Sequence, residues 1–489
     1  SPTYSIVGAP EGAKPQELDY PDDTQPNGQA NNTYSGKGGV PVGSLFERLL
    51  FTAKFQEGNI LLSDLVNPES RILWIREPVE RIEKVAPWLT LDSDPYPSVV
   101  DGRIVWIVDG YTTTNGYPYS RRTSLGEATA DSLTSTRAGV IVPVREEVNY
   151  IRNSVKATVD AYDGTVTLYE WDQTDPVLKA WRAAFPGTVQ DYGTISPDLM
   201  QHLRYPEDFF KVQRKLFAEY HVTDPRAFYS GQDFWKVPDD PTAPAPDQAQ
   251  PPYYLTLQMP GQSAPAFSLT TTFAPFNRDT LAAFMAVNAQ PGPDFGTIRV
   301  LQLPSNTTIP GPGQVQNNFE ADPDVATTLS LLRRGGSEVD LGNLLSLPVG
   351  GGVLYVEPVY VRASTGQSSY PLLKKVLVSF GNRIGFADTL PQALDQVFEG
   401  DAGTSPPPDT DGEQPPVDDT LEQALADAEQ ALTDADAALK AGDFAAYGEA
   451  QQRLADAIAR AVAASGGTPA TPTSPSPEPT VSAAPAVLG

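Results

Sequence analysis

Four aspartates surround one short strand-like run and are the first candidates for chemistry. Asp92 and Asp94 lie in the turn-rich segment 88–97, and Asp101 and Asp109 flank the apolar run 102–108. Carboxylate oxygens bind hard cations such as Ca²⁺ and also supply the acid and base of glycosidases. The D-x-D-P and D-G patterns are equally typical of ordinary turns. Turn structure, a Ca²⁺ site with Asp92, Asp94 and Asp101 as ligands, and carboxylate catalysis are therefore the open interpretations.

Other catalytic patterns are missing from the sequence. The chain has no cysteine, two histidines (His202 and His221), and neither a G-x-S-x-G nor an H-E-x-x-H motif. The glycine run 350–352 leads into a strand-like segment rather than a helix, so it predicts a turn and not a phosphate cradle. Both histidines are interpreted as surface or helix-end residues. We assign no catalytic or cofactor-binding residue, and the sequence favours a non-enzymatic protein without excluding an enzyme.

Five tryptophans offer a different kind of site. They could line a carbohydrate or lipid groove, although aromatic residues on apolar faces more often pack in a core. These residues are Trp88, Trp106, Trp171, Trp181 and Trp235.

Length, charge and hydropathy narrow the class of protein. The 489 residues suffice for several domains, and the net charge of −27 disfavours nucleic acids and anionic lipids as partners. The absence of cysteine suits a bacterial extracytoplasmic protein that does without disulfides, and a cytosolic protein can also lack cysteine. No apolar run is long enough to span a membrane, and the first residues lack the basic start and apolar core of a signal peptide. We expect the targeting element of an exported protein to lie before Ser1.

The pattern of elements predicts an α+β fold with mixed, largely antiparallel sheets, packed helices and a C-terminal helical hairpin. A hairpin is expected over 154–170 around Asp163-Gly164, a capped helix begins after Ser44, and residues 112–138 are expected to form a surface loop. The predicted parts are an extended arm (1–43), an α+β part (44–237), a Pro-rich loop or boundary (238–252), a sheet-rich α+β part (253–400), an acidic linker (401–418), the helical hairpin (419–465) and a disordered tail (466–489).

Residues 353–398 make the clearest folding unit: two strands, a hairpin and a capped helix. Pro358 interrupts the first strand, which predicts an edge strand or a bulge at that position. Glu357 beside it is the one polar residue of this unit that merits a test.

Several long segments carry a resemblance to a known family. RLLFTAKFQEGNILLSDLVNPESRILWIREP, from residue 48 onward, and HLRYPEDFFKVQRKLFAEYHVTDPRAFYSGQDFWKVP, at residues 202–238, resemble the actinobacterial membrane proteins of uncharacterised protein family 0182. Similar segments are 149–169, 251–262, 311–323, the stretch from 353 to about 390, and ALKAGDFAAYGEAQ in the predicted hairpin. The resemblance spans about residues 1–465.

The resemblance implies a larger membrane protein with several transmembrane helices upstream, of which this chain is the soluble extracytoplasmic region. The expected location is the cell membrane, and the expected partners are the transmembrane region of the same protein and an envelope component or partner protein. The leading hypothesis is a binding or structural module. The alternatives are a transport accessory or lipid-handling domain and a carboxylate-dependent envelope hydrolase. The resemblance assigns no catalytic residue.

Overall fold

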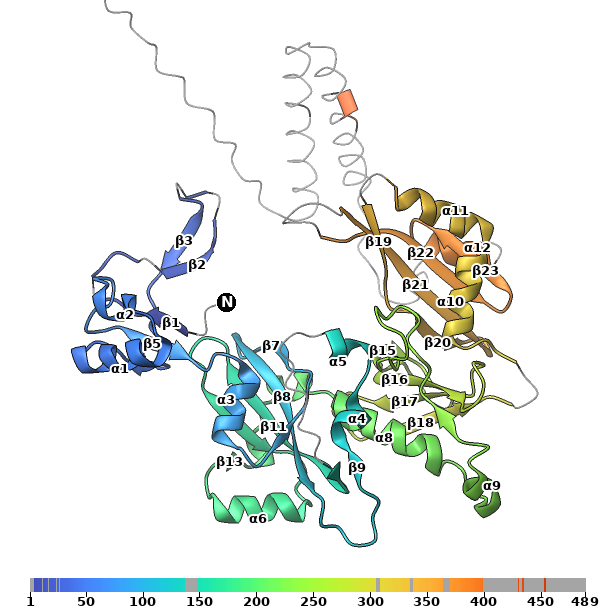
Figure 1. The fold of residues 1–489 in the computed structure, drawn as a ribbon, viewed down its shortest axis with the longest axis horizontal. Coiled ribbons are helices and arrows are strands. Elements are labelled where there is room, and N and C mark those ends of the chain that lie inside the picture. Colours follow the sequence, from blue (N-terminus) through green and yellow to red (C-terminus); the bar gives the residue numbers. More distant parts are fainter. Residues whose placement is uncertain are drawn as a thin grey trace, which may run out of the picture. The chain divides into compact units, whose positions relative to one another are not determined.

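A computed structural model describes residues 4–136 and 147–398, apart from residues 11, 16, 23, 26, 305–307, 335–336 and 364–369, together with Gln430, Thr433, Asp434 and Arg453 (Figure 1). The chain divides into two compact units, Ser1–Ala402 and Gly403–Gly489. The predicted linker, helical hairpin and tail therefore lie outside the described residues, except for those last four. The first unit combines helices with mostly antiparallel sheets, which confirms the α+β class.

The N-terminal segment contains more regular structure than the expected extended arm. A three-stranded sheet runs in the order β1-β5-β4, and two further strands, β2 and β3, pair with each other. Ser44 and Glu47 form the predicted capping box at the start of the first helix, since the Ser44 hydroxyl accepts from the Glu47 amide and the Glu47 carboxylate from the Ser44 amide. The elements are β1 (Tyr4–Val7), β2 (Glu17–Pro21), β3 (Gln29–Asn32), β4 (Val40–Pro41), α1 (Leu45–Phe55), α2 (Asn59–Leu62) and β5 (Arg71–Trp74).

The next sheet is the scaffold of the candidate site. Its order is β13-β12-β11-β8-β6, with β7 paired to the other part of β8, and β12–β13 is its one parallel pair among the described ladders. The predicted hairpin around Asp163-Gly164 is confirmed as β11 and β12. The bounds are α3 (Pro78–Val85), β6 (Thr90–Leu91), β7 (Tyr96–Val100), β8 (Arg103–Thr114), β11 (Tyr150–Asp160), β12 (Val166–Glu170), α6 (Pro176–Ala184), β13 (Val189–Gln190), η1 (Tyr192–Thr194) and α7 (Pro197–His202).

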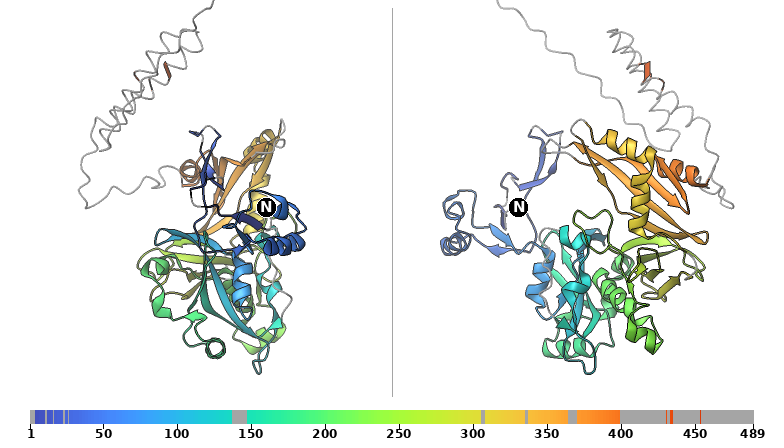
Figure 2. Two further views of the ribbon diagram at one scale, coloured as in Figure 1. Left: turned by 90° about the vertical axis from the view of Figure 1, so that its left-hand side faces the viewer. Right: turned by 45° about the vertical axis from the view of Figure 1, so that its right-hand side comes forward.

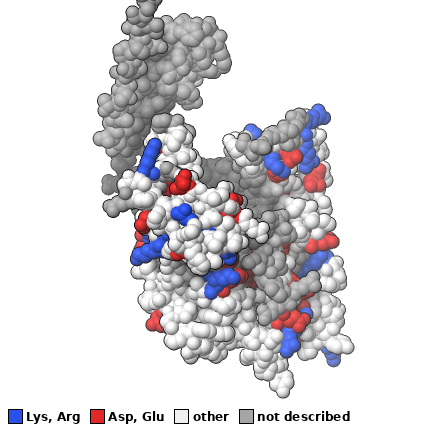
Figure 3. All heavy atoms as spheres, turned by 60° about the vertical axis from the view of Figure 1, so that its left-hand side comes forward, with Lys and Arg blue, Asp and Glu red and all other residues white. Residues whose placement is uncertain are grey.

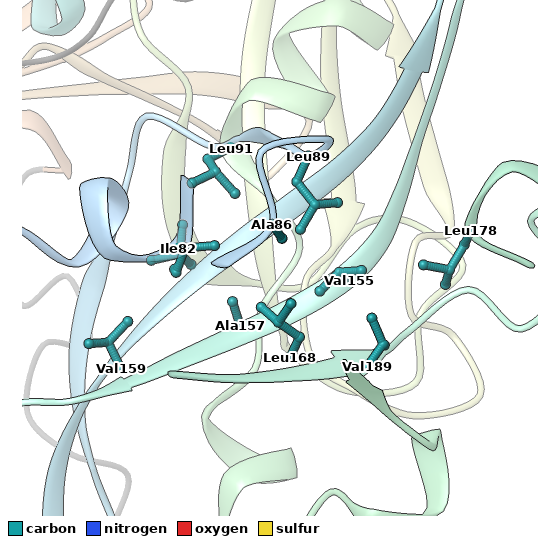
Figure 4. Close-up of a cluster of buried hydrophobic side chains, with 11 residues drawn as sticks. Ile82, Ala86, Leu89, Leu91, Val155, Ala157, Val159, Leu168, Leu178 and Val189 are labelled. Atoms are coloured by element: carbon teal, nitrogen blue, oxygen red, sulfur yellow. The ribbon is translucent and has the colours of Figure 1, made fainter. Parts of the chain in front are cut away.

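Strand alternation gives this sheet two different faces. Val155, Ala157 and Val159 of β11 point to one side and pack with α3 and α6 in an apolar cluster (Figure 4). The opposite side carries Ile107 of β8 in a second cluster with η1 and α7. The polar residues that alternate with the first set, including Lys156, therefore lie on this second side, where the candidate site is built.

The expected surface loop at 112–138 is wrong. Strand β8 continues to Thr114 because Tyr111, Thr112, Thr113 and Thr114 pair with the first residues of β11, a partner that a local pattern does not reveal. Ser124 then caps a short helix by accepting from the Glu127 amide. The segment contains β9 (Thr123–Ser124), α4 (Leu125–Thr129) and α5 (Ser132–Thr136), and β10 (Glu147–Val148) pairs with β9.

A third sheet packs against a long helix. Its order is β14-β16-β17-β18 with β15 also on β16, and the aromatic side of α8 covers it through Phe210 and Phe217. The bounds are α8 (Glu207–Tyr220), α9 (Pro225–Ser230), β14 (Trp235–Lys236), β15 (Tyr253–Leu257), β16 (Ala266–Pro275), β17 (Ala283–Asn288) and β18 (Ile298–Gln302).

The C-terminal sheet, which is orange in Figure 2, has the order β19-β21-β22-β23, with β20 also on β21. Helices α10 and α11 cover one face and α12 the other. The edge position expected for Pro358 is wrong, because β21 is central. Its neighbour on one side changes from β20 to β19 near Pro358, and a bulge follows between Val359 and Tyr360. The bounds are α10 (Pro312–Ala321), α11 (Pro323–Leu332), β19 (Ser337–Leu341), β20 (Leu345–Val349), β21 (Gly352–Ala363), β22 (Leu372–Phe380), β23 (Arg383–Ala387) and α12 (Leu390–Phe398).

The surface of the described part is mixed in charge. Basic and acidic side chains are interspersed over the face that Figure 3 displays. Within the described residues, no helix has both the length and the apolar character needed to cross a membrane.

Candidate functional site

The three aspartates considered as Ca²⁺ ligands have separate environments. Asp92 follows β6 and is 3% exposed, whereas Asp94 accepts from the Arg204 guanidinium at 2.6 Å. Asp101 lies in the exposed turn between β7 and β8, where its carboxylate accepts from Ser196 at the start of α7. Among the described residues, no group of three His, Cys, Asp or Glu side chains is arranged to hold a metal ion. The Ca²⁺ site therefore stays a prediction, and the described residues provide no set of ligands that supports it.

Asp92 belongs instead to a buried carboxylate pair. Its carboxylate accepts from the Tyr111 hydroxyl and from the Asp208 amide, the latter at 3.0 Å. The Asp208 carboxylate in turn accepts from the amide and hydroxyl of Ser93 at 2.8 and 3.1 Å. Burial, and after it the charges of Asp208 and Asp109, raise the pKa of Asp92 well above its ordinary value. This environment favours a protonated Asp92.

A buried ion pair lies across the two long strands of the same sheet. Asp109 of β8 and Lys156 of β11 are direct partners in the register, so alternation places both side chains on one face. Their side chains form an ion pair, with Lys156 0% exposed, and the Lys156 ammonium also donates to the Arg204 carbonyl at 2.8 Å. Burial lowers the pKa of Lys156, and the Asp109 carboxylate opposes that shift.

The start of α8 carries three more buried charged residues, Glu207, Asp208 and Lys211. Together with Asp92, Asp109 and Lys156 they form a buried charged cluster. Lys211 Nζ lies 2.6 Å from Asp131 Oδ2, 2.8 Å from Glu207 Oε1 and 3.5 Å from Asp208 Oδ1. Burial disfavours the charged lysine, but these carboxylates outweigh it and raise the pKa of Lys211. Burial raises the pKa of Glu207 to about 7, although Lys211 acts in the opposite direction. The start of α8 is thus tied by charge to the segment between α4 and α5.

An open pocket of about 920 Å³ lies beside this cluster. Five aromatic side chains form much of its wall, and they come from four separate parts of the chain. Ring centroids lie 5.2 Å apart for Trp171 and Phe295, 5.6 Å for Trp171 and Tyr192, and 5.4 Å for Tyr205 and Phe295. Phe209, which follows the first residues of α8, is the fifth ring. Aromatic walls with a few polar groups are typical of ligand sites.

The polar part of the pocket comes mainly from β11 and the end of β12. Asn153 lies at a bulge of β11 and is 9% exposed. Its amide Nδ2 donates to Asp109 Oδ1 at 2.9 Å, and among the described residues its buried Oδ1 has no hydrogen-bond partner. Arg152 is paired with Asp172 at 2.5 Å and donates to the Thr174 hydroxyl at 2.7 Å. The pocket therefore contains a neutralised charge pair, and an acceptor without a described partner is buried in its wall.

The buried ion pair supports the pocket from behind. Lys156 Nζ lies 5.1 Å from the ring centroid of Trp171 and 5.9 Å from that of Phe295. Asp109 holds both Lys156 and the Asn153 amide. The Asp109 carboxylate thus holds the Lys156 ammonium close to the rings of Trp171 and Phe295. It also fixes the orientation of the Asn153 amide.

Sequence reasoning found one wall residue and missed most of the others. Of the five tryptophans considered, Trp171 lines the pocket, whereas Trp88 and Trp181 stack on each other at 5.3 Å. Trp106 packs against the apolar cluster of Figure 4, and Trp235 stacks on His221. One signal in the sequence could have indicated this site. Lys156 is a charged residue in a strand that was clearly predicted, and it alternates with the apolar residues Val155 and Ala157.

Both histidines and the glycine run lie in ordinary structural positions. His202 ends α7, and its Nε2 is 3.9 Å from Asp198; His221 caps α8, with Nδ1 3.0 Å from the Phe217 carbonyl oxygen. Gly350 and Gly351 form the tight turn between β20 and β21, with φ of +56° and +80°.

Glu357 is a second unusual position, in the C-terminal sheet. Its side chain is 0% exposed, and neither carboxylate oxygen has a hydrogen-bond partner among the described residues. Burial, with the charges of Glu320 and Asp240 adding to it, raises the pKa of Glu357 to about 8, while the Gln316 amide on α10 acts in the opposite direction. Sequence reasoning selected this residue, although the edge-strand argument beside it was wrong.

Comparison with known proteins finds one protein family and a set of relatives from actinobacteria. The model of the uncharacterised protein family UPF0182 matches residues 1–332. A UPF0182 protein of Streptomyces coelicolor is 55% identical over 467 residues, which cover 94% of this chain and 46% of that protein. A UPF0182 protein of Paenarthrobacter aurescens is 50% identical over 499 residues (96% and 50%), and one of Leifsonia xyli is 50% identical over 518 residues (95% and 52%). The chain spans about half the length of these actinobacterial relatives. No solved structure matches it.

Proposed function

Because the chain belongs to the uncharacterised protein family UPF0182, whose curated members it matches over about half their length, we propose that it is the extracytoplasmic part of a multi-spanning membrane protein. In this proposal the part is a binding module that engages an envelope component or a partner protein. The remaining length of the relatives leaves room for a membrane-spanning region. The lack of cysteine in all 489 residues suits an extracytoplasmic location.

The aromatic pocket is the observation that carries the binding role. A volume of about 920 Å³ is in the range of small-ligand sites, and its wall combines aromatic rings in mutual contact with the polar groups of Asn153, Gln173 and the Arg152–Asp172 pair. Arg152 and Asn153 lie on β11 and Phe209 lies on α8, whereas Trp171, Asp172 and Gln173 directly follow β12. Anchoring by these elements suits recognition, since less order must be gained on binding.

The geometry favours binding over hydrolysis. Glycoside hydrolysis needs two carboxyl groups on either side of the scissile bond. Among the described lining residues, Asp172 is the single carboxylate, and it is ion-paired with Arg152. Asp92 and Asp109 lie behind the wall, each 3% exposed, where they engage Tyr111 and Lys156.

Co-purification tests the binding role. The full-length protein and its Trp171→Ala variant are extracted from cells, and whatever accompanies each is identified by mass spectrometry. We expect an envelope component or partner protein that is recovered with the wild type and depleted with the variant. Trp181→Ala serves as the matched control, because Trp181 stacks on Trp88 outside the pocket. Identical recovery from all three proteins would argue against the pocket as the binding site.

Location is tested with an introduced thiol. Since this part of the protein has no cysteine, Tyr229→Cys places one thiol at a residue of α9 that is 94% exposed. We expect a membrane-impermeant maleimide to label it in intact cells. Labelling that occurs only after permeabilisation would refute the extracytoplasmic location.

A second cavity supports lipid handling as the alternative function. It has a volume of about 680 Å³ and lies among α4, β10, β11 and α8, with a mostly apolar lining that includes Leu125, Ile151, Val212 and Leu216. Acyl chains suit such a lining. Organic extraction of the purified chain followed by lipid mass spectrometry tests this alternative, with Val212→Glu as the variant that should lose any bound lipid.

A further inference from the structure

From the aromatic pocket beside the Asp109–Lys156 pair, we infer that its ligand is an uncharged, hydroxylated ring, namely a sugar unit of a glycan. This inference rests on the proposed function, because it takes the pocket to be the binding site. It adds the chemical class of the ligand. Charge, hydrogen bonding and the shape of the wall each lead to that class.

Charge argues for a neutral ligand. Among the described lining residues, Arg152 and Asp172 are the charged ones, and their side chains neutralise each other at 2.5 Å. A cationic ligand held by the aromatic rings would meet the Lys156 ammonium, which already lies 5.1 Å from the Trp171 ring and 5.9 Å from the Phe295 ring. Two cations on the same rings repel each other. An anionic ligand would meet no cation in the lining that is free of a carboxylate partner.

Hydrogen bonding argues for a ligand that donates. Asp109 is ion-paired with Lys156, and its carboxylate accepts from the Asn153 amide, so the Nδ2 of Asn153 faces Asp109 and its Oδ1 is the free acceptor. Within the described residues this oxygen has no partner and less than 1 Å² of accessible surface, so a ligand donor reaches it only when the Asn153 side chain or a neighbouring wall ring shifts. The donor then recovers the cost of about 1–3 kcal/mol of a buried acceptor without a partner. A hydroxyl or an amide N–H supplies such a donor. Purely apolar ligands, such as acyl chains, do not.

The wall argues for flat, apolar ring faces. Trp171, Tyr192, Tyr205 and Phe295 lie with neighbouring centroids 5.2–5.6 Å apart and with planes inclined by 44–76°, so each ring is a separate apolar surface. A pyranose ring presents C–H groups on its faces and hydroxyls at its edge, so it can stack on the rings while donating to Asn153. The C–H faces meet the negative face of an aromatic ring, which is a favourable electrostatic contact.

Titration with defined probes tests the inference on the complete 489-residue chain. The neutral probes are a β-1,4-linked N-acetylglucosamine tetramer, maltohexaose and an α-1,6-linked mannotriose; choline and dodecanoate are the cationic and acyl probes. Binding is followed by isothermal calorimetry and by saturation-transfer NMR. We expect at least one oligosaccharide to bind, with choline and dodecanoate showing no binding that depends on Trp171.

Variants assign the binding to the pocket. Trp171→Ala and Asn153→Ala are each expected to weaken oligosaccharide binding about tenfold or more, as loss of one stacking ring or one buried hydrogen bond would. Tyr192→Ala keeps the test valid if Asn153→Ala does not fold, and Trp181→Ala is the control that should bind as the wild type does.

The outcomes separate this inference from the proposed function. Choline or dodecanoate binding that is lost in Trp171→Ala, without oligosaccharide binding, overturns the sugar inference and leaves the pocket as a binding site. Oligosaccharide binding that survives Trp171→Ala and Tyr192→Ala overturns the assignment to this pocket. No binding of any probe, together with co-purification that does not depend on Trp171, overturns both proposals.

Discussion

Replacing Glu357 with glutamine should stabilise the C-terminal sheet, and the gain should grow with pH. The side chain lies on the face of β21 that α10 and α11 cover and is 0% exposed. Within the described part of the chain neither oxygen has a partner in hydrogen-bond geometry, although the Gln316 amide is near enough to oppose the rise in pKa. Its pKa is raised from 4.5 to about 8 in the folded protein. Glutamine has almost the same shape and cannot ionise. The variant therefore removes the cost of the charge while it keeps the packing.

The sign follows from proton binding. A carboxyl group whose pKa is raised on folding holds its proton more tightly in the folded state. The folded protein therefore loses free energy of unfolding as pH rises above 4.5. The loss continues until pH passes the folded-state pKa of about 8 and is constant above it. One pKa unit corresponds to about 1.4 kcal/mol, which makes the loss about 3 kcal/mol at pH 7 and about 5 kcal/mol at pH 9. The difference in free energy of unfolding between Glu357→Gln and the wild type should therefore be larger by these amounts at pH 7 and pH 9 than at pH 4.5.

Hydrogen exchange followed by mass spectrometry measures this locally. Peptides from β21 and α10 report the free energy of opening of the C-terminal sheet, which contains no tryptophan for fluorescence. The quantity compared is the difference between variant and wild type at pH 5, 7 and 9, corrected for intrinsic exchange rates. Glu320→Gln is the matched control, because Glu320 lies on the exposed side of α10 and acts on Glu357 only through its charge. A difference that stays constant or shrinks from pH 5 to 9 would refute the reasoning.

Three further predictions, with five substitutions, test other parts of the structure. Lys156→Met leaves the Asp109 carboxylate buried without its cation and should cost about 3–5 kcal/mol in urea unfolding, whereas Lys215→Met, on the surface of α8, should cost less than about 1 kcal/mol. Gly385→Ala places a methyl group of β23 against the Ala393 carbonyl of α12, so it should cost about 1–3 kcal/mol and raise hydrogen exchange in α12 without affecting β11. Leu45→Ser, at a residue 75% exposed, should change the free energy of unfolding by less than about 0.5 kcal/mol, whereas Ile60→Ala, at a residue 2% exposed, should cost about 2–4 kcal/mol.

Elements with strong local signals were predictable from the sequence. The β11–β12 hairpin has alternating strands around Asp163-Gly164, and α1 has its capping box at Ser44 and Glu47, so each is specified by residues within one short segment. Helix α8 likewise shows its aromatic side in the sequence. Such elements need no knowledge of their partners, because turn chemistry and periodicity act within the segment itself.

Predictions failed where a distant partner decides the structure. The last residues of β8 read as a polar loop, yet they pair with the start of β11, which lies more than 30 residues later. Pro358 was expected at an edge or a bulge because proline cannot donate to a ladder; the edge position is wrong, although a bulge follows between Val359 and Tyr360. Pro358 is accommodated in a central strand because two different strands, β20 and β19, share that side of β21 and meet near it. Pairing of this kind is set by tertiary contacts and has no local signature.

The pocket was beyond sequence reasoning because its wall is assembled from distant segments, and buried charge helps to position them. Lys211 connects the start of α8 to Asp131, and Lys156 connects β11 to β8 and to the Arg204 carbonyl just before Tyr205. Buried ion pairs are a weak source of net stability, since desolvation offsets much of their attraction. Their directional contacts nevertheless admit few alternative arrangements. Because Asp109 orients the Asn153 amide and also holds the cation beneath Trp171, losing that one carboxylate would alter the polar and the aromatic sides of the pocket together.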